Sequence, residues 1–96
     1  MKYCLGLLTV ELHIADNQSL KGRRSVLSSL KERIRGRFNV SVAEADFGDV
    51  WQRAGLIVSG AGASAATVEQ ALRGVLEFID GDPRVQVIAP QIRFYE

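Results

Sequence analysis

The chain has 96 residues, of which 47% are apolar, 24% are charged and two are proline. This length and composition predict one globular domain over residues 1–96, and they exclude a disordered chain or two separate cores. One cysteine and one histidine exclude an internal disulfide and a structural zinc site built from four Cys or His side chains.

The first predicted element is a β-strand over residues 8–14. Apolar and polar residues alternate there, which is the period of a strand with one buried face. Glu11 and His13 interrupt the apolar run, which argues against an export signal, and nothing approaches the roughly 20 apolar residues of a membrane span. Together with the unpaired Cys4, this predicts a cytoplasmic protein without a membrane partner.

A helix is predicted next, from an N-cap at Ser19 to about Arg37. Residues 39–46 then predict a strand whose apolar residues do not alternate cleanly, as expected for a bulge or a sheet edge. Residues 53–61 predict a central strand, which a turn over residues 47–52 joins to the preceding one. The apolar stripe of the helix consists of Val26, Leu27, Leu30 and Ile34.

The second half of the chain predicts a helix and a final strand. Ser64 caps the helix, Gly81 is expected in the left-handed conformation after it, and Pro83 prevents its continuation. Residues 85–95 predict a strand with a kink at Pro90, which an edge strand tolerates. This order of elements predicts an α+β ferredoxin-like βαββαβ fold, a four-stranded antiparallel sheet with two helices on one face.

The positive charge is concentrated on the first predicted helix. Residues 21–37 contain seven basic residues and one acidic residue, whereas the rest of the chain contains five basic and ten acidic residues. A ridge away from the apolar stripe extends over about 21 Å and can follow a phosphate backbone. The alternative is an ordinary solvated helix face. The ridge consists of Lys21, Arg24, Ser28, Lys31 and Arg35.

The start of this helix is also a candidate anion site. Cations there oppose the helix dipole, and the free backbone N–H groups can bind a phosphate, sulfate or carboxylate. The alternative is pairing of the cations with acidic residues such as Asp16 or Glu44. A salt bridge from Glu44 to the basic helix is also one interpretation of the acidic residues near the following turn. The predicted anion site consists of Ser19, Lys21, Arg23 and Arg24.

Three motifs resemble a known family. They are SLKGRRSV (Ser19 to Val26), FNVSVAEAD (Phe38 to Asp46) and WQRA (Trp51 to Ala54). In this order they resemble the bacterial YlxP-like family, known as domain of unknown function 503, over nearly the whole chain. The resemblance implies a ferredoxin-like fold and a cytoplasmic protein without an established activity or accepted active-site residues. Some members are similar to a protein encoded beside translation and ribosome-maturation factors, which implies RNA or a ribosomal particle as partner. At Gly22, relatives often carry an acidic residue.

The remaining candidates concern the open face of the sheet. Its two central strands offer no aromatic side chain for base stacking, which argues against binding in the manner of an RNA-recognition motif. A partly apolar open face favours a homodimer or a partner protein instead. Trp51 and Arg53 are candidate partner contacts, although for Trp51 the favoured alternative is that it closes the hairpin end of the core.

No catalytic residue, metal or cofactor is predicted. A small acylphosphatase-like enzyme is the least favoured function, because the characteristic glycine-rich loop with its arginine is absent between the first strand and the first helix. The favoured function is RNA or ribosome binding through the basic helix. A homodimer or protein-interaction module that uses the open sheet face is the alternative.

Overall fold

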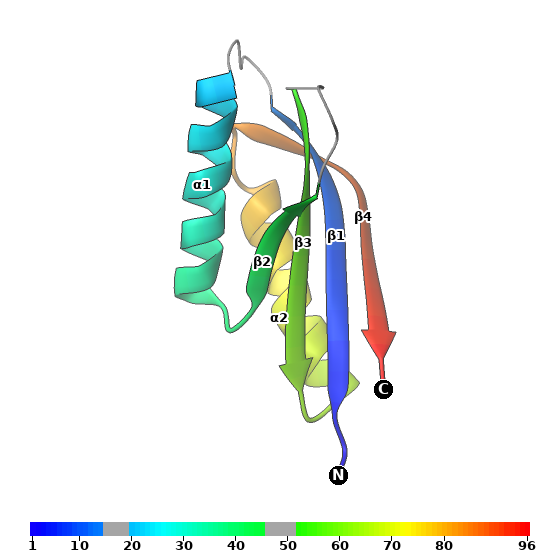
Figure 1. Cartoon of the computed structure of the whole chain (residues 1–96). Coiled ribbons are helices and arrows are strands. Elements are labelled where there is room, and N and C mark those ends of the chain that lie inside the picture. The colour runs from blue at the N-terminus through cyan, green and yellow to red at the C-terminus, as the bar shows by residue number, and fades with distance from the viewer. Residues whose placement is uncertain (15–19, 46–51) are drawn as a thin grey trace.

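The computed structural model confirms the predicted ferredoxin-like α+β fold and describes residues 1–14, 20–45 and 52–96. The four strands form an antiparallel sheet in the order β2-β3-β1-β4, and the two helices lie on one of its faces (Figure 1). The elements are β1 (Cys4–Ile14), α1 (Leu20–Arg37), β2 (Ser41–Ala45), β3 (Arg53–Gly62), α2 (Ala65–Asp80) and β4 (Val85–Tyr95).

β1 lies at the centre of the sheet and begins earlier than predicted. It pairs with both β3 and β4 and starts at Cys4 rather than at residue 8. Its even-numbered residues face the helices, and Gly6 continues that buried row. A β-carbon on Gly6 would overlap the side chains of Val68 and Leu72, so the glycine allows α2 to approach the strand closely.

The core lies between the sheet and the helix layer. The predicted stripe of α1 is confirmed, because Leu27, Leu30 and Ile34 are buried and Val26 packs partly buried against the core. From α2 the core receives Val68, Leu72, Val75 and Ile79. Burial of each large aliphatic side chain contributes about 1.5–3 kcal/mol of transfer free energy. These contacts hold α1 against the sheet with its apolar stripe inward, and the opposite side of the helix is therefore turned to solvent.

The two ends of α2 differ in how well the sequence predicts them. Ser64 is the predicted N-cap, and its hydroxyl accepts a hydrogen bond from the backbone N–H of Thr67 at 3.2 Å. At the other end the predicted left-handed conformation of Gly81 is wrong, because its φ is −78°. The Gly81 N–H instead donates to the Glu77 carbonyl, which extends the helical hydrogen bonding by one residue.

Both edge strands depart from regular pairing. β2 covers residues 41–45, a shorter strand than the predicted 39–46, of which Asp46 lies outside the described residues. In β4 the pairing with β1 shifts between Thr9 and Glu11, opposite Ala89 and Pro90. Ala89 has a φ of 50°, so the predicted kink at Pro90 is confirmed as a β-bulge on an edge strand.

Candidate nucleic-acid interface

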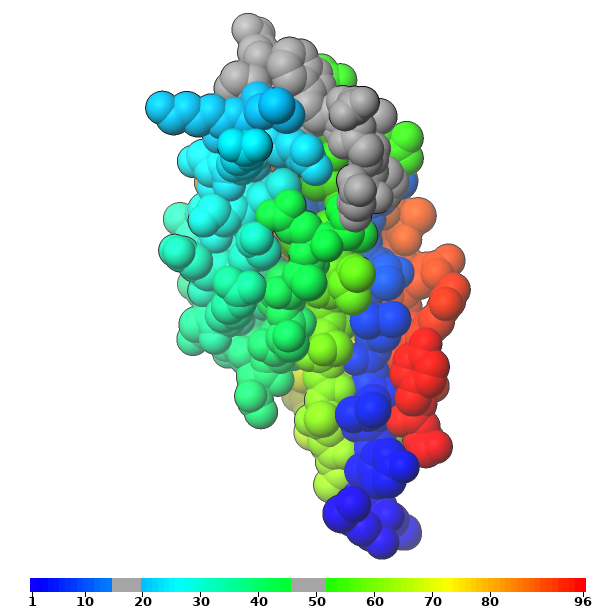
Figure 2. Space-filling model, viewed as in Figure 1, coloured from blue at the N-terminus to red at the C-terminus, as the bar shows by residue number. Residues whose placement is uncertain are grey.

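The basic helix lies along the outer side of the short edge strand. α1 and β2 are neighbours at one edge of the sheet, and β4 forms the opposite edge (Figure 1; Figure 2). Because the apolar stripe of α1 faces the core, the predicted ridge points toward β2 and solvent. The structure therefore places these cations along the α1 edge of the molecule.

Lys31 is joined to β2 by an ion pair. Its ammonium lies 2.8 Å from Glu44 Oε1, and the two side chains retain 24% and 39% of their exposure. The expectation that Glu44 can bridge to the basic helix is thereby confirmed. Lys31 is consequently a partly neutralised cation, whereas the prediction treated it as a free member of the ridge.

Arg35 reaches the backbone of the same strand. Its Nη2 donates a hydrogen bond to the Val42 carbonyl at 3.0 Å. An edge strand carries unpaired backbone groups, and this hydrogen bond satisfies one of them. The guanidinium has five N–H donors, so most of them remain for other acceptors.

The cations at the start of α1 occupy two different sides of the helix. Lys21 and Arg24 are exposed, and neither forms an ion pair with a carboxylate of the described residues. Arg23 is partly buried, and its Nε is enclosed without a hydrogen-bond partner in the described part of the chain. Helical spacing places Arg23 in line with the apolar residues Leu27 and Leu30 rather than on the ridge.

Of the four residues of the predicted anion site, the structure describes Lys21, Arg23 and Arg24. The structure does not bring Arg23 onto the side occupied by Lys21 and Arg24, and Ser19 lies outside the described residues. Sequence reasoning missed this division although the signal was present. Arg23 precedes Leu27 by four residues and Leu30 by seven, which is the spacing of the apolar stripe itself.

The opposite side of α1 holds a separate set of polar contacts. The guanidinium carbon of Arg37 lies 4.8 Å above the centre of the Phe78 ring. Arg84 donates to both oxygens of Asp82, at 3.0 and 2.7 Å, and also to the hydroxyl of Ser29 in α1. Hydrogen bonds from Arg84 hold the pKa of the Asp82 carboxyl below its usual value. These residues connect α1 to α2 and to the turn that follows it.

Of the two predicted partner contacts, the structure describes Arg53. It forms an ion pair with Glu11 across the open face of the sheet. Trp51 lies outside the described residues. The charge of Arg53 is therefore balanced by that of Glu11 on β1, and this part of the face carries little net charge.

The rest of the open face combines small side chains with a few large apolar ones. Leu5, Ile88 and Tyr95 are exposed by 48%, 37% and 52%. Between them, the register places residues such as Thr9 and Ala43 in the same surface. The described residues of β1 and β3 provide no aromatic side chain on this face. RNA bases therefore have no aromatic ring on the two central strands against which to stack.

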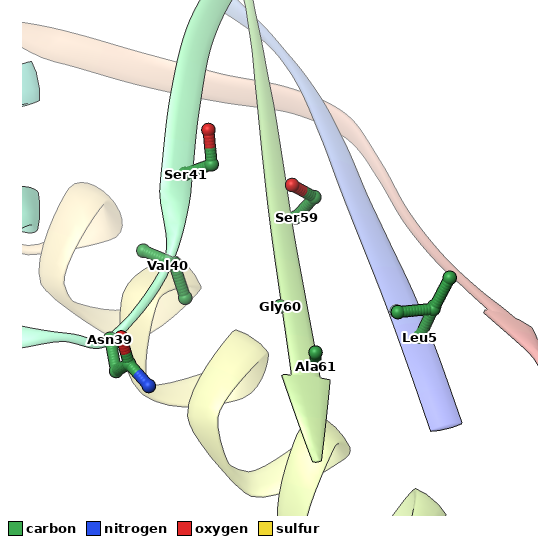
Figure 3. Close-up of a pocket in the computed structure, with 8 residues that line it drawn as sticks. Leu5, Asn39, Val40, Ser41, Ser59, Gly60 and Ala61 are labelled. Carbon is green, nitrogen blue, oxygen red and sulfur yellow. The ribbon is translucent and has the colours of Figure 1, made fainter. Parts of the chain in front are cut away.

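A shallow hollow of about 500 Å³ lies where β3 continues past the beginning of β2 (Figure 3). None of its lining side chains is charged. Across the described ranges, no three of His, Cys, Asp and Glu are close enough to hold a metal ion. The lining residues labelled in Figure 3 are Leu5, Asn39, Val40, Ser41, Ser59, Gly60 and Ala61.

Fold and charge together define a class of protein, a small ferredoxin-like α+β domain with a basic helix at one edge of its sheet. Residues 5–92 match the family described as "Protein of unknown function (DUF503)". The chain belongs to this family, which confirms the resemblance seen in its three motifs. In what the structure describes, neither helix is long and apolar enough to cross a membrane.

Two known proteins illustrate the relationship. "Uncharacterized protein YlxP" of Bacillus subtilis (strain 168) is 35% identical over 82 residues, which are 85% of this chain and 89% of that protein. The de novo designed protein Foldit4 has a TM-score of 0.55 and 11% identity, with 99% of this chain and 98% of the other covered. The second comparison shows the fold alone.

Proposed function

We propose that this domain binds RNA through the cations on the outward side of α1. The observation that carries the proposal is the position of Lys21 and Arg24, which lie about one turn apart, are exposed, and have no carboxylate partner among the described residues. Lys31 and Arg35 continue the same side of the helix toward its end. Exposed cations of this kind attract a polyanion and release its counterions on binding.

The partners of Lys31 and Arg35 are compatible with this function. An exposed ion pair contributes only about 0–1 kcal/mol, so a phosphate oxygen can replace the Glu44 carboxylate at low cost. Arg35 uses one donor for the Val42 carbonyl and keeps others for a phosphate. From Lys21 to Arg35 the helix rises about 21 Å, which is enough to follow several phosphates of one strand.

The open sheet face also favours contact with the phosphate backbone of the RNA over contact with its bases. The open sheet face lacks the aromatic residues on β1 and β3 with which domains of this topology stack bases. The resemblance to YlxP-like proteins, some of them similar to a protein encoded beside translation factors, supports RNA or a ribosomal particle as the polyanion. We place the domain in the cytoplasm, where a free thiol such as Cys4 stays reduced.

The test is RNA binding as a function of salt, measured by fluorescence anisotropy with an unstructured RNA. Lys21→Gln with Arg24→Gln should weaken binding about tenfold or more at low salt and reduce the salt slope by about one to two. Lys2→Gln with Arg73→Gln is the matched control, since it removes the same charge from the segment before β1 and from α2. No binding at low ionic strength, or equal losses in both double variants, would refute the proposal.

A second candidate function is contact with a partner protein through the open sheet face. It is supported by the exposed apolar side chains of Leu5, Ile88 and Tyr95 and by the internal neutralisation of Glu11 by Arg53. Ile57→Lys places a charge in the middle of this face and should abolish such a contact, whether the partner is a different protein or a second copy. Unchanged binding of the variant to its partner, and an unchanged molar mass, would exclude this surface.

A further inference from the structure

The two edge strands of the sheet, β2 and β4, differ in how far other parts of the chain cover them. Along β2, α1 covers the outer side, and Arg35 donates to the Val42 carbonyl there. Along β4, no strand or helix among the described residues pairs with the outer side, and the strand forms an open rim of the molecule (Figure 1; Figure 2). An edge of this kind presents a row of backbone N–H and C=O groups to any second strand.

The bulge divides β4 into two parts. Ala89 and Pro90 interrupt the ladder, and Pro90 has no N–H to donate. Beyond them, Gln91–Tyr95 pairs regularly with Leu5–Thr9, and Phe94 and Tyr95 are exposed by 38% and 52%. The second part of β4 is therefore an extended, regular edge with exposed aromatic side chains.

We propose that a second copy of this chain pairs with this part of β4, antiparallel and about a two-fold axis. The axis stands perpendicular to the sheet, because only then do the two strands run in opposite directions with their helices on the same side. Across this axis, even-numbered residues of one copy face even-numbered residues of the other, and odd-numbered residues face odd-numbered ones. Three alignments of the regular segment satisfy this requirement, and they centre on Ile92, Arg93 or Phe94.

The side chains of the strand favour one of the three alignments. Centring on Ile92 draws Pro90 and the bulge into the new ladder, where Pro90 cannot donate. Centring on Arg93 sets two guanidinium groups opposite each other, and the described polar partner of Arg93 is the neutral amide of Gln91. Centring on Phe94 avoids both conflicts.

The Phe94-centred alignment is complementary to itself. It places Arg93 of each copy opposite Tyr95 of the other, so two cation–aromatic pairs form, and it sets the two Phe94 side chains side by side. The same strand supplies both the cation and the ring. This is why the structure favours a second copy over an unrelated peptide as the occupant of the edge.

The experiment measures molar mass by light scattering from micromolar to near-millimolar chain concentration. The unmodified chain should approach twice its 10.5 kDa as the concentration rises. Tyr95→Lys places an ammonium opposite Arg93 of the second copy, and it should raise the dissociation constant of the dimer on the order of tenfold or more. Tyr95 is exposed, so the variant should keep its fold, which circular dichroism checks.

Two further variants distinguish this edge from other surfaces. Arg93→Glu combined with Tyr95→Lys sets opposite charges across the axis and should restore the doubled mass. Ile57→Lys lies on the open face away from β4 and should leave the dimer intact. A chain that remains at 10.5 kDa, a Tyr95→Lys variant that remains dimeric, or a dimer that Ile57→Lys abolishes would overturn the proposal. RNA binding by a monomer would leave the proposed function standing.

Discussion

The Nζ atom of Lys31 lies 2.8 Å from Oε1 of Glu44, so the only acidic residue of β2 is paired with the basic helix. Both side chains are partly exposed, and such pairs contribute about 0–1 kcal/mol. The pair thus matters less for stability than for charge, since it places a carboxylate beside the cations proposed to bind RNA.

Glu44→Gln should therefore strengthen RNA binding. Removal of the carboxylate frees the Lys31 ammonium for phosphate, and we expect an increase in affinity of about two- to fivefold at low salt, which corresponds to roughly 1 kcal/mol or less. Fluorescence anisotropy titrations measure it. Glu69→Gln, which frees Arg73 on α2, is the matched control and should change little. A weaker complex with Glu44→Gln would contradict the role given to Lys31.

Gly6→Ala should destabilise the fold, because a β-carbon at this position overlaps Val68 and Leu72 of α2. Overpacking of this kind costs about 1–3 kcal/mol, measurable by urea unfolding. The control is Gly36→Ala in α1, where nothing lies within 4 Å of the added carbon. That exposed helical site should gain up to about 1 kcal/mol. Equal effects at the two glycines would contradict close packing of α2 on β1.

The Asp82–Arg84 pair should make stability depend on acid pH. Hydrogen bonds from Arg84 lower the pKa of Asp82 in the folded state relative to the unfolded state. The contribution of the pair is therefore complete above the unfolded pKa, and it is lost as the pH falls through the lower folded pKa.

Asp82→Asn tests this dependence. At neutral pH the variant should be less stable than the unmodified chain by about 1–2 kcal/mol, because it loses charge-assisted hydrogen bonds to Arg84. The difference between the two free energies of unfolding should shrink in strong acid, where the carboxylate of the unmodified chain is protonated. Urea unfolding at a series of pH values measures it, and a difference that stays constant with pH would contradict the assignment.

Ser64→Ala should weaken the start of α2. The hydroxyl accepts from the backbone N–H of Thr67, and removal of an N-cap of this kind costs about 0.5–2 kcal/mol. Thermal unfolding gives the measurement, with Ser28→Ala on the exposed side of α1 as the control. If both serine variants melt at the same temperature as the unmodified chain, the cap contributes nothing.

The predictable part of this fold is the part governed by periodicity. The stripe Leu27, Leu30 and Ile34 and the polar alternation of residues 8–14 depend on neighbours along the chain, and both were confirmed. The early start of β1 was missed, because a buried Gly6 makes sense only once α2 lies against it. Gly81 was assigned a left-handed conformation because helices commonly end that way, but here the next hydrogen bond of the helix still forms.

In the candidate site, too, the features set by neighbours along the chain were predictable and those set by tertiary contacts were not. The concentration of cations on one helix was visible in the sequence, but their partners were not. Lys31 meets Glu44 and Arg35 meets Val42 only because β2 returns alongside α1, which is a tertiary contact between segments with no local signal. Arg23 was grouped with Lys21 and Arg24 by nearness in sequence, whereas its helical position assigns it to the apolar side.

The hydrogen bond from Arg35 to the Val42 carbonyl also limits how many copies can assemble. A sheet with two open edges can add strands at both, and copies joined head to tail in that way grow into fibres. Among the described residues, the helix and the arginine cover one edge of the sheet, so a pairing through β4 leaves no second uncovered edge strand to which a further copy could add. Any sheet built from this chain in that manner must stop at two copies.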